Sequence, residues 1–172
     1  MRDVIVKTAI EQDAKLIADL SRKTFYDTFA PFNSAEDMDK FMTEQFTYPR
    51  LMEEVGKPES IFLLAYYNNE AVGYARLRRS ANPDGLGDVP AIEIARIYAV
   101  QESIGKGVGR ALMQECLAIA STEGKQLIWL GVWEKNLKAI DFYSRWGFEK
   151  FGEHEFVLGN DVQIDWLRRK RL

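Results

Sequence analysis

Three glycines occupy alternate positions of the segment 105–109, GKGVG. The segment follows a nearly continuous apolar run, 91–100, and precedes a helical pattern that begins near Val108. Glycine lets a backbone turn with its N–H groups pointing one way, and a ligand can approach without meeting a Cβ atom. The first N–H groups of a helix lack intrahelical acceptors and carry partial positive charge. The turn therefore predicts a phosphate or pyrophosphate site, with Lys106 and Arg110 able to add charge at its rim.

Two familiar nucleotide-binding motifs do not match Gly105, Gly107 and Gly109. The P-loop pattern G-x-x-x-x-G-K-[ST] is absent from the chain. The dinucleotide pattern G-x-G-x-x-G fails because the third glycine comes one residue early, and no acid stands where a dinucleotide ribose needs one. A tight strand-to-helix turn without any ligand is the alternative that the glycines alone leave open.

Glu93 is a second candidate for chemistry, because it interrupts an otherwise apolar run. We expect its face to carry Ala91, Ala95 and Ala99 together with Ile97, and the small alanines leave room for a substrate. A carboxylate in that position can act as a general base. The alternative is a buried carboxylate paired with Arg96 or another cation.

The composition excludes several other chemistries. The 172 residues include one cysteine, Cys116, and one histidine, His154, so an intrachain disulfide, a cysteine metal cluster and a His-rich metal site are not expected. A net charge of −3 argues against a nucleic-acid partner. No apolar run reaches the roughly 18 residues that span a bilayer, and the N-terminus lacks a signal-peptide pattern. We expect a single cytoplasmic domain over residues 1–172 with no metal and no membrane partner. Cys116 is expected in the core, and His154 is assigned no role.

Periodicity predicts a mixed α/β fold in the order β, α, α, β, β, β, α, β, α, β, β. The expected strands cover 4–6, 61–67, 71–77, 91–100, 127–133, 149–158 and 162–169. The expected helices follow Thr8, cover 36–46 with a short piece at 50–55, run from 108 to 124, and begin at Asn136.

Local signals set the ends of several of these elements. Thr8 with Glu11 reads as a capping box for the first helix. Asn136 can cap the last helix and Gly147 can stop it. The basic run 168–171 is expected to be a solvated chain end.

Two motifs resemble those of the GNAT family of N-acetyltransferases. The strand end Tyr98-Ala99-Val100 and the segment 104–109 are similar to that family's acyl-CoA loop, Q/R-x-x-G-x-G/A, with Ile104 where Gln or Arg is usual. The segment 136–148 is similar to the family's N-x-x-A-x-x-F-Y-x-x-x-G-F. The two motifs occur in the family's order with a strand between them. The resemblance implies a mostly antiparallel twisted sheet of about seven strands with flanking helices.

The resemblance also implies the reaction, which is acetyl transfer from acetyl-CoA to a small primary amine by direct attack. The strand end would pair with the pantetheine arm, the glycine turn would bind the pyrophosphate, and Asn136 would bind pantetheine. Glu93 is the expected general base and Tyr143 the general acid for the departing sulfur, although spacing alone fits Tyr143 as a core aromatic. The implied cofactor contacts are Ile97, Tyr98, Ala99, Val100, Gly105, Lys106, Gly107, Val108, Gly109, Arg110, Asn136 and Tyr143.

A closer likeness is to the PaiA-type polyamine acetyltransferases, through the segments 24–29 and 129–136. Polyamines, protein N-termini and other small amines all remain open as acceptors. A non-catalytic acyl-CoA-binding module is the alternative to an enzyme. The chain could also form a homodimer. Four acids could attract a cationic amine or could simply be solvated: Asp27, Asp84, Asp88 and Glu134.

Overall fold

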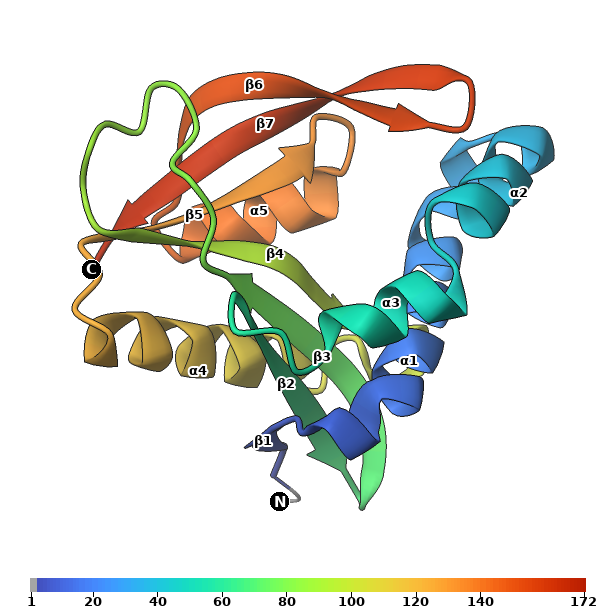
Figure 1. The fold of residues 1–172 in the computed structure, drawn as a ribbon, viewed down its shortest axis with the longest axis horizontal. Helices are drawn as coiled ribbons and strands as arrows, with labels where there is room; N and C mark the ends of the chain where they lie inside the picture. Colours follow the sequence, from blue (N-terminus) through green and yellow to red (C-terminus); the bar gives the residue numbers. More distant parts are fainter. Residues whose placement is uncertain (1–2) are drawn as a thin grey trace.

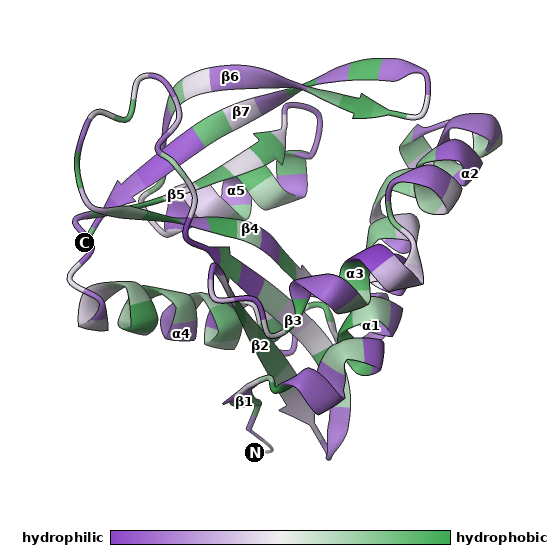
Figure 2. Cartoon of the chain, in the orientation of Figure 1, coloured by the Kyte–Doolittle hydropathy of each residue, from purple (hydrophilic) through white to green (hydrophobic). Residues whose placement is uncertain are grey.

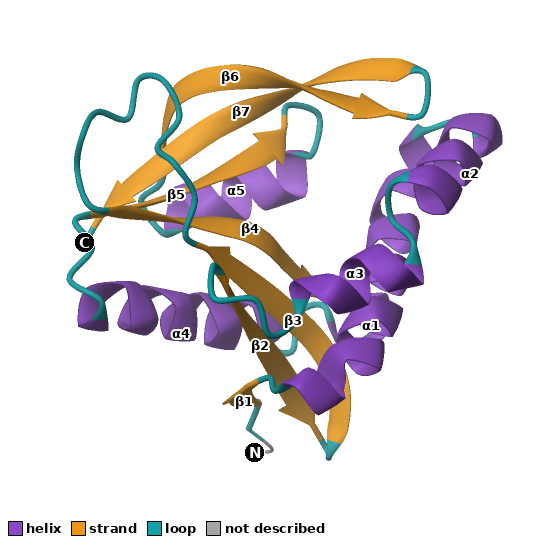
Figure 3. Cartoon of the chain, in the orientation of Figure 1, coloured by secondary structure: helices purple, strands orange, loops and turns teal. Residues whose placement is uncertain are grey.

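One twisted sheet of seven strands runs through the protein, in the order β1-β2-β3-β4-β5-β7-β6 (Figures 1 and 3). The structure is a computed structural model that describes residues 3–172, so the first two residues of the expected domain lie outside the description. The β4–β5 pair is parallel and the other neighbours are antiparallel, which confirms the predicted mixed α/β sheet. The strands are β1 (Ile5–Thr8), β2 (Ser60–Tyr67), β3 (Glu70–Arg78), β4 (Ala91–Ala99), β5 (Leu127–Trp133), β6 (Glu149–Leu158) and β7 (Asp161–Arg171).

Helices cover both faces of the sheet. They are α1 (Ala14–Phe29), α2 (Ala35–Glu44), α3 (Tyr48–Glu54), α4 (Val108–Thr122) and α5 (Leu137–Arg145), with short 3-10 turns at Glu11–Asp13, Ala30–Phe32 and Gln101–Ser103. On β3, Gly73 faces α4, and Arg76, three residues further along, reaches α3. Because alternate strand residues point to opposite faces, α1 to α3 lie on one face and α4 lies on the other.

The core forms where strands buried on both faces meet these helices. The central strands are the most apolar part of the ribbon, whereas the helices are apolar mainly on the side toward the sheet (Figure 2). The hairpin between β2 and β3 turns at Asn68 and Asn69, whose φ angles of +53° and +64° suit asparagine better than most residues. The predicted hairpin at this position is confirmed.

The predicted capping box at Thr8 is wrong. Thr8 ends β1 and pairs with Leu63 of β2. The helical segment begins after Ile10, whose N–H donates to the carboxylate of Asp13 at 2.9 Å. Thr8 therefore belongs to the sheet through its pairing with β2, and it does not cap the helix as the local pattern predicted.

The basic run at 168–171 is not a solvated chain end. Strand β7 continues to Arg171 and pairs with β5 over the whole of β5. Arg168 is buried, and its guanidinium donates to the carbonyls of Ile140 and Phe148 and to Ser144 Oγ at 2.6–2.9 Å. The side chain therefore ties α5 to the sheet.

Candidate active site

The two central parallel strands separate soon after they meet. β4 and β5 pair only over Ala91–Glu93 and Leu127–Trp129. Beyond that point β4 stays paired with β3 and β5 stays paired with β7, so the strand ends splay apart. A cleft of about 580 Å³ lies at the splay, lined by both strands, α1, α5 and the β6–β7 hairpin.

The glycine turn lies beside this cleft, at the start of α4. Gly105 and Gly107 have φ angles of +87° and +85°, and a Cβ atom on either would meet open space. The N–H groups of Ile104 and Lys106 donate to carbonyls within the turn. In the segment 105–110, five N–H groups have no backbone acceptor among the described residues: those of Gly105, Gly107, Val108, Gly109 and Arg110. This open cradle of amides at a helix N-terminus fits a diphosphate.

The free edge of β4 faces the splay. The Val100 N–H donates to the Val72 carbonyl on the β3 side at 2.8 Å. Because N–H groups alternate along a strand, those of Ile97 and Ala99 point to the opposite edge, where β5 has moved away. An extended amide-bearing chain can therefore add to this edge as a further strand.

Helix α5 closes the same side of the cleft. Asn136 caps it as predicted, with its side-chain oxygen accepting from the Ala139 N–H at 3.3 Å. Tyr143 lines the cleft and is otherwise buried. Burial raises the pKa of its phenol above the ordinary value, and the nearby Cys116 adds to the rise. Tyr143 is therefore a proton donor at neutral pH.

The predicted site residues fall into three groups. Six line the cleft itself: Ile97, Tyr98, Ala99, Gly109, Asn136 and Tyr143. Val100 directly follows β4, and the other predicted cofactor contacts, Gly105, Lys106, Gly107, Val108 and Arg110, form the adjacent turn and helix start. Glu93 is apart from both groups and does not line the cleft.

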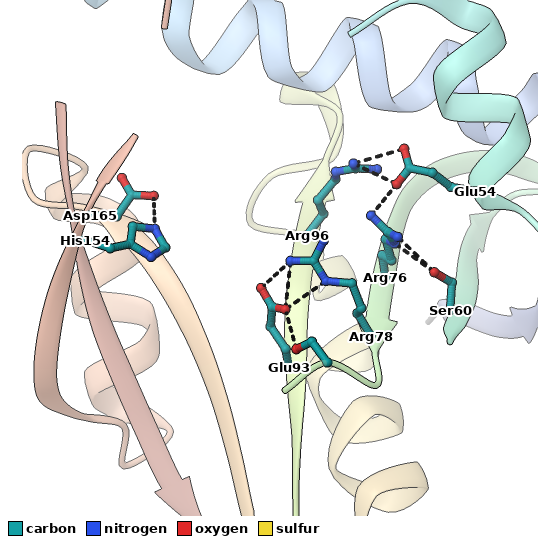
Figure 4. A network of polar contacts seen from close by, with 9 residues as sticks. Glu54, Ser60, Arg76, Arg78, Glu93, Arg96, His154 and Asp165 are labelled. Carbon is teal, nitrogen blue, oxygen red and sulfur yellow. Dashed lines mark hydrogen bonds and ion pairs between the residues drawn. The ribbon is translucent and has the colours of Figure 1, made fainter. Parts of the chain in front are cut away.

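Glu93 is held by a neighbouring cation, as the alternative interpretation expected, but the cation is Arg78 and not Arg96. The Arg78 guanidinium donates to both carboxylate oxygens at 2.9 Å, and Ser80 Oγ donates to one of them at 3.1 Å (Figure 4). Leu86 of the loop after β3 packs with Trp129 and Leu167 in one cluster. The loop covers this part of the sheet.

The predicted face of Glu93 is also wrong. A β-bulge in β4 shifts the register, so that Glu93 pairs with Arg78 whereas Arg96 pairs with Arg76. Arg76 and Arg78 are two residues apart on β3 and share a face, so Glu93 shares its face with Arg96 and not with Ala95. The extra residue inverts the alternation that the sequence pattern assumed.

The half of the cleft away from the glycine turn is aromatic. Its lining includes Phe25, Phe29, Phe41, Phe46, Trp133 and Phe156. None of the acids proposed to attract an amine lines it, whether Asp27, Asp84, Asp88 or Glu134. Asp165 and Gln163 of β7 line this half of the cleft instead, and neither was predicted from the sequence. The one available signal was the alternation of polar and apolar residues over the first six residues of β7, 161–166.

Other features have no part in this site. Cys116 is buried, and burial raises the pKa of its thiol to about 12, which confirms a core role. In residues 3–172 no group of three or more His, Cys, Asp or Glu side chains is arranged to hold a metal ion. The same part of the chain has no helix with both the length and the apolar character needed to cross a membrane.

A splayed parallel strand pair beside an amide cradle defines a class of acyl-donor sites, and comparison with known proteins gives the family. The model of the acetyltransferase (GNAT) family matches residues 22–148, and the chain belongs to this family. The resemblance found from the two motifs is confirmed. The protein is an N-acetyltransferase that uses acetyl-CoA as its acetyl donor.

Relatives match along almost the whole chain. An uncharacterized N-acetyltransferase of Lactobacillus delbrueckii subsp. lactis is 36% identical over 172 residues, covering 100% of this chain and 99% of its own. A spermidine N(1)-acetyltransferase of Thermoplasma acidophilum is 26% identical over 149 residues, covering 84% of this chain and 87% of its own. The crystal structure of PaiA N-acetyltransferase from T. acidophilum in complex with coenzyme A has the same fold. Its TM-score is 0.79, at 20% identity and with 99% of each chain covered.

Proposed function

We propose that the protein transfers the acetyl group of acetyl-CoA to a primary amine on a small molecule, by direct attack within the cleft. The observation that carries the proposal is the splay of β4 from β5 next to the open amides of the glycine turn. These two features hold opposite ends of one elongated donor. The turn binds the diphosphate, and the free edge of β4 at Ile97 and Ala99 pairs with the amide-bearing arm.

Three groups of this chain act on the reacting end. A β4 N–H at the splay donates to the thioester oxygen as charge develops there. Tyr143 gives its phenolic proton to the departing sulfur. The role of base remains a prediction for Glu93, and its bond to Arg78 and its place outside the cleft lining favour another group.

Gly107→Ala tests the diphosphate site. Since no atom lies near the added Cβ, the variant folds, at a cost of about 1–2 kcal/mol for an alanine with positive φ. The methyl group and the strained turn disturb the amide cradle, so the Kd for coenzyme A should rise about tenfold. Titration calorimetry measures it.

Gly87→Ala is the matched control for this prediction. Gly87 has a φ angle of +86° and also faces open space, but it lies in the loop after β3. The control should lose the same stability and keep its affinity for coenzyme A. Equal affinities in the two variants would contradict a diphosphate site at the glycine turn.

The acceptor is proposed to be a primary amine with an apolar or aromatic body. Six aromatic rings line the acceptor half of the cleft, and Asp165 is the one carboxylate in the cleft lining within residues 3–172. Such a surface gains more from burying an apolar body than from holding several ammonium groups.

A polyamine is the second candidate acceptor. It is supported by the names of two relatives: the Thermoplasma protein above and a spermine/spermidine N(1)-acetyltransferase of Bacillus subtilis, 27% identical over 103 residues. Several spaced acids along the cleft would suit a polyamine better than this lining does.

Thiol release from acetyl-CoA separates these candidates. The panel is 2-phenylethylamine, spermidine and a short peptide with a free N-terminus, with kcat/KM measured for each. We expect amine-dependent release, highest for 2-phenylethylamine. A rise in melting temperature with acetyl-CoA, combined with no release for any amine, would instead identify a non-catalytic binding module.

A further inference from the structure

Asp165 is an acid in the cleft that takes no part in the donor binding and thiol protonation proposed for this site. It lies on β7, directly across from Trp133 on β5. Its side chain is 17% exposed, and it lines the cleft together with Tyr98 and Tyr143. Its charge makes a small contribution to raising the pKa of the Tyr98 phenol, which is raised mainly by burial and also by Tyr74 and Tyr143. Asp165 therefore faces the same part of the cleft as Tyr143, the general acid of the proposed transfer.

His154 stands behind this carboxylate, on the side toward solvent. The two residues pair across β6 and β7, with Nε2 of His154 at 3.4 Å from Oδ2 of Asp165. The His154 side chain is 48% exposed. Figure 4 shows this pair on its own hairpin, apart from the strands that hold Glu93 and Arg78. The pair thus joins the cleft to bulk water.

Gly131 opens the cleft toward this pair. It lies on β5, lines the cleft, and has no side chain to cover its neighbours. A Cβ atom there would lie 3.5 Å from His154 Nε2 and 3.7 Å from Asp165 Oδ2, which is ordinary contact. A larger residue would stand between the cleft and both polar groups.

Burial alone would leave a carboxylate here poorly solvated. Burial raises the pKa of the Asp165 carboxyl, whereas the charge of His154 and the hydrogen bond between the two side chains lower it. The charged and titratable groups that line the cleft with Asp165 are Arg96 and Tyr98 from β4 and Lys138 and Tyr143 from α5, and His154 of β6 pairs with Asp165 directly. In the part of the chain described, the ion pair of Asp165 is with His154 through Oδ2 and none is with a lysine or arginine, which leaves Oδ1 for a cation from the substrate.

We propose that Asp165 is a catalytic residue, which binds the acceptor ammonium and takes a proton from it, with His154 passing that proton to water. This inference rests on the proposed acetyl transfer. One proton leaves the ammonium for Asp165, and the neutral nitrogen attacks the thioester carbon. The N–C bond forms, the C–S bond breaks, and the sulfur takes the phenolic proton of Tyr143. The second nitrogen proton restores the phenol, so one proton in total reaches solvent through His154.

Asp165→Asn is the first test. With the best amine of the panel we expect kcat/KM to fall about 100-fold at pH 7, with the Kd for coenzyme A unchanged. Without a base the reaction depends on amine that is already neutral, so the deficit should shrink as the pH rises toward about 10, near the pKa of an alkyl amine. A deficit that is the same at every pH, or a loss below threefold, would overturn the proposal.

His154→Gln and Gly131→Ala keep the test decisive if Asp165→Asn does not fold. His154→Gln should lower kcat/KM several-fold near pH 7 with the same recovery at high pH. Gly131→Ala, which has room for its methyl group, should lower kcat/KM for the amine without changing the Kd for coenzyme A. Wild-type behaviour of both variants would overturn the proposal.

Two comparisons separate this inference from its rivals. Glu155→Gln is the matched control, since Glu155 neighbours His154 on the opposite, exposed face of β6. Glu93→Gln tests the earlier candidate, and a pH-dependent deficit there with none in Asp165→Asn would return the role of base to Glu93. If the unmodified protein releases no thiol with any amine, the proposed function itself fails. If the unmodified protein releases thiol and Asp165→Asn has the same kcat/KM, only the role of Asp165 is excluded and the proposed function stands.

Discussion

Replacing Tyr143 with phenylalanine is expected to lower kcat about 100-fold, at the lower end of the range for general acid catalysis. The substitution removes one oxygen atom and keeps the ring, which packs at 5.5 Å from Phe142 and 5.8 Å from Phe148 between ring centres. The melting temperature and the Kd for coenzyme A should therefore change little. Steady-state thiol release measures the fall in kcat, and a melting curve checks that the stability is unchanged.

The pH dependence of this effect follows from the burial of Tyr143. Burial and the neighbouring Cys116 raise the pKa of the phenol, and Arg168 opposes the rise. The phenol therefore stays protonated at every pH below its ordinary value of about 10. We expect kcat to show no descending limb from Tyr143 below that pH. A limb between pH 8 and 9 that Tyr143→Phe removes would contradict this assignment.

Tyr48→Phe is the matched control, since it removes the same oxygen from an exposed tyrosine on α3. It should retain wild-type kcat. A kcat within threefold of wild type for Tyr143→Phe would show that Tyr143 is a core aromatic on the apolar side of α5, as its spacing alone suggested.

Local chemistry predicted the backbone of the glycine turn and of the start of α5. The glycine turn and the Asn136 cap each depend on a few consecutive residues, and the structure shows the expected backbone at both. The positive φ angles at Gly105 and Gly107 follow from residue type, because few other residues adopt them at low cost. Strand β5 was predicted to the residue, since its apolar run has clear ends.

The other features depend on contacts between distant residues, and the sequence could not supply them. The β-bulge at Ala95 exists only relative to β3, so the alternation around Glu93 looked regular. Arg168 looked solvated because its three acceptors lie 20 to 28 residues away. Asp165 and His154 are brought together by hairpin register, which depends on where the turn falls.

A buried charge cluster between α3 and the sheet is another such feature, and it leads to the largest expected loss of stability. Glu54 accepts from Arg96 Nη2 at 2.9 and 3.1 Å and forms an ion pair with Arg76. Arg76 also donates to Ser60 Oγ at 2.9 and 3.0 Å (Figure 4). The three charged side chains are only 8–18% exposed. One carboxylate therefore balances two guanidinium groups in a poorly solvated place.

Glu54→Ala is expected to lower the free energy of unfolding by about 3–5 kcal/mol, because it leaves two buried cations without a counter-charge. Urea unfolding measures the loss as a lower midpoint. Glu53→Ala is the matched control, since Glu53 is the adjacent, exposed residue of α3 and should cost less than about 0.5 kcal/mol. A similar small loss in both variants would show that solvent screens the cluster.

Glu54→Ala should also weaken binding of the acceptor amine more than binding of coenzyme A. Arg96 lines the cleft and lies over the ring of Phe46, at 5.1 Å from its centre. Loss of Glu54 frees Arg96, which lines the cleft together with Phe46 on the acceptor side, and loosens α3, which follows Phe46 in the chain. Among the described residues, the polar partners of Glu54 are Arg76 and Arg96, and neither the glycine turn nor Ile97 and Ala99 form a hydrogen bond or ion pair with it. At a temperature where Glu54→Ala is still folded, KM for the amine should therefore rise several-fold, and the Kd for coenzyme A should stay constant. A parallel rise in both constants would mean that the cluster supports the whole sheet and not the acceptor wall alone.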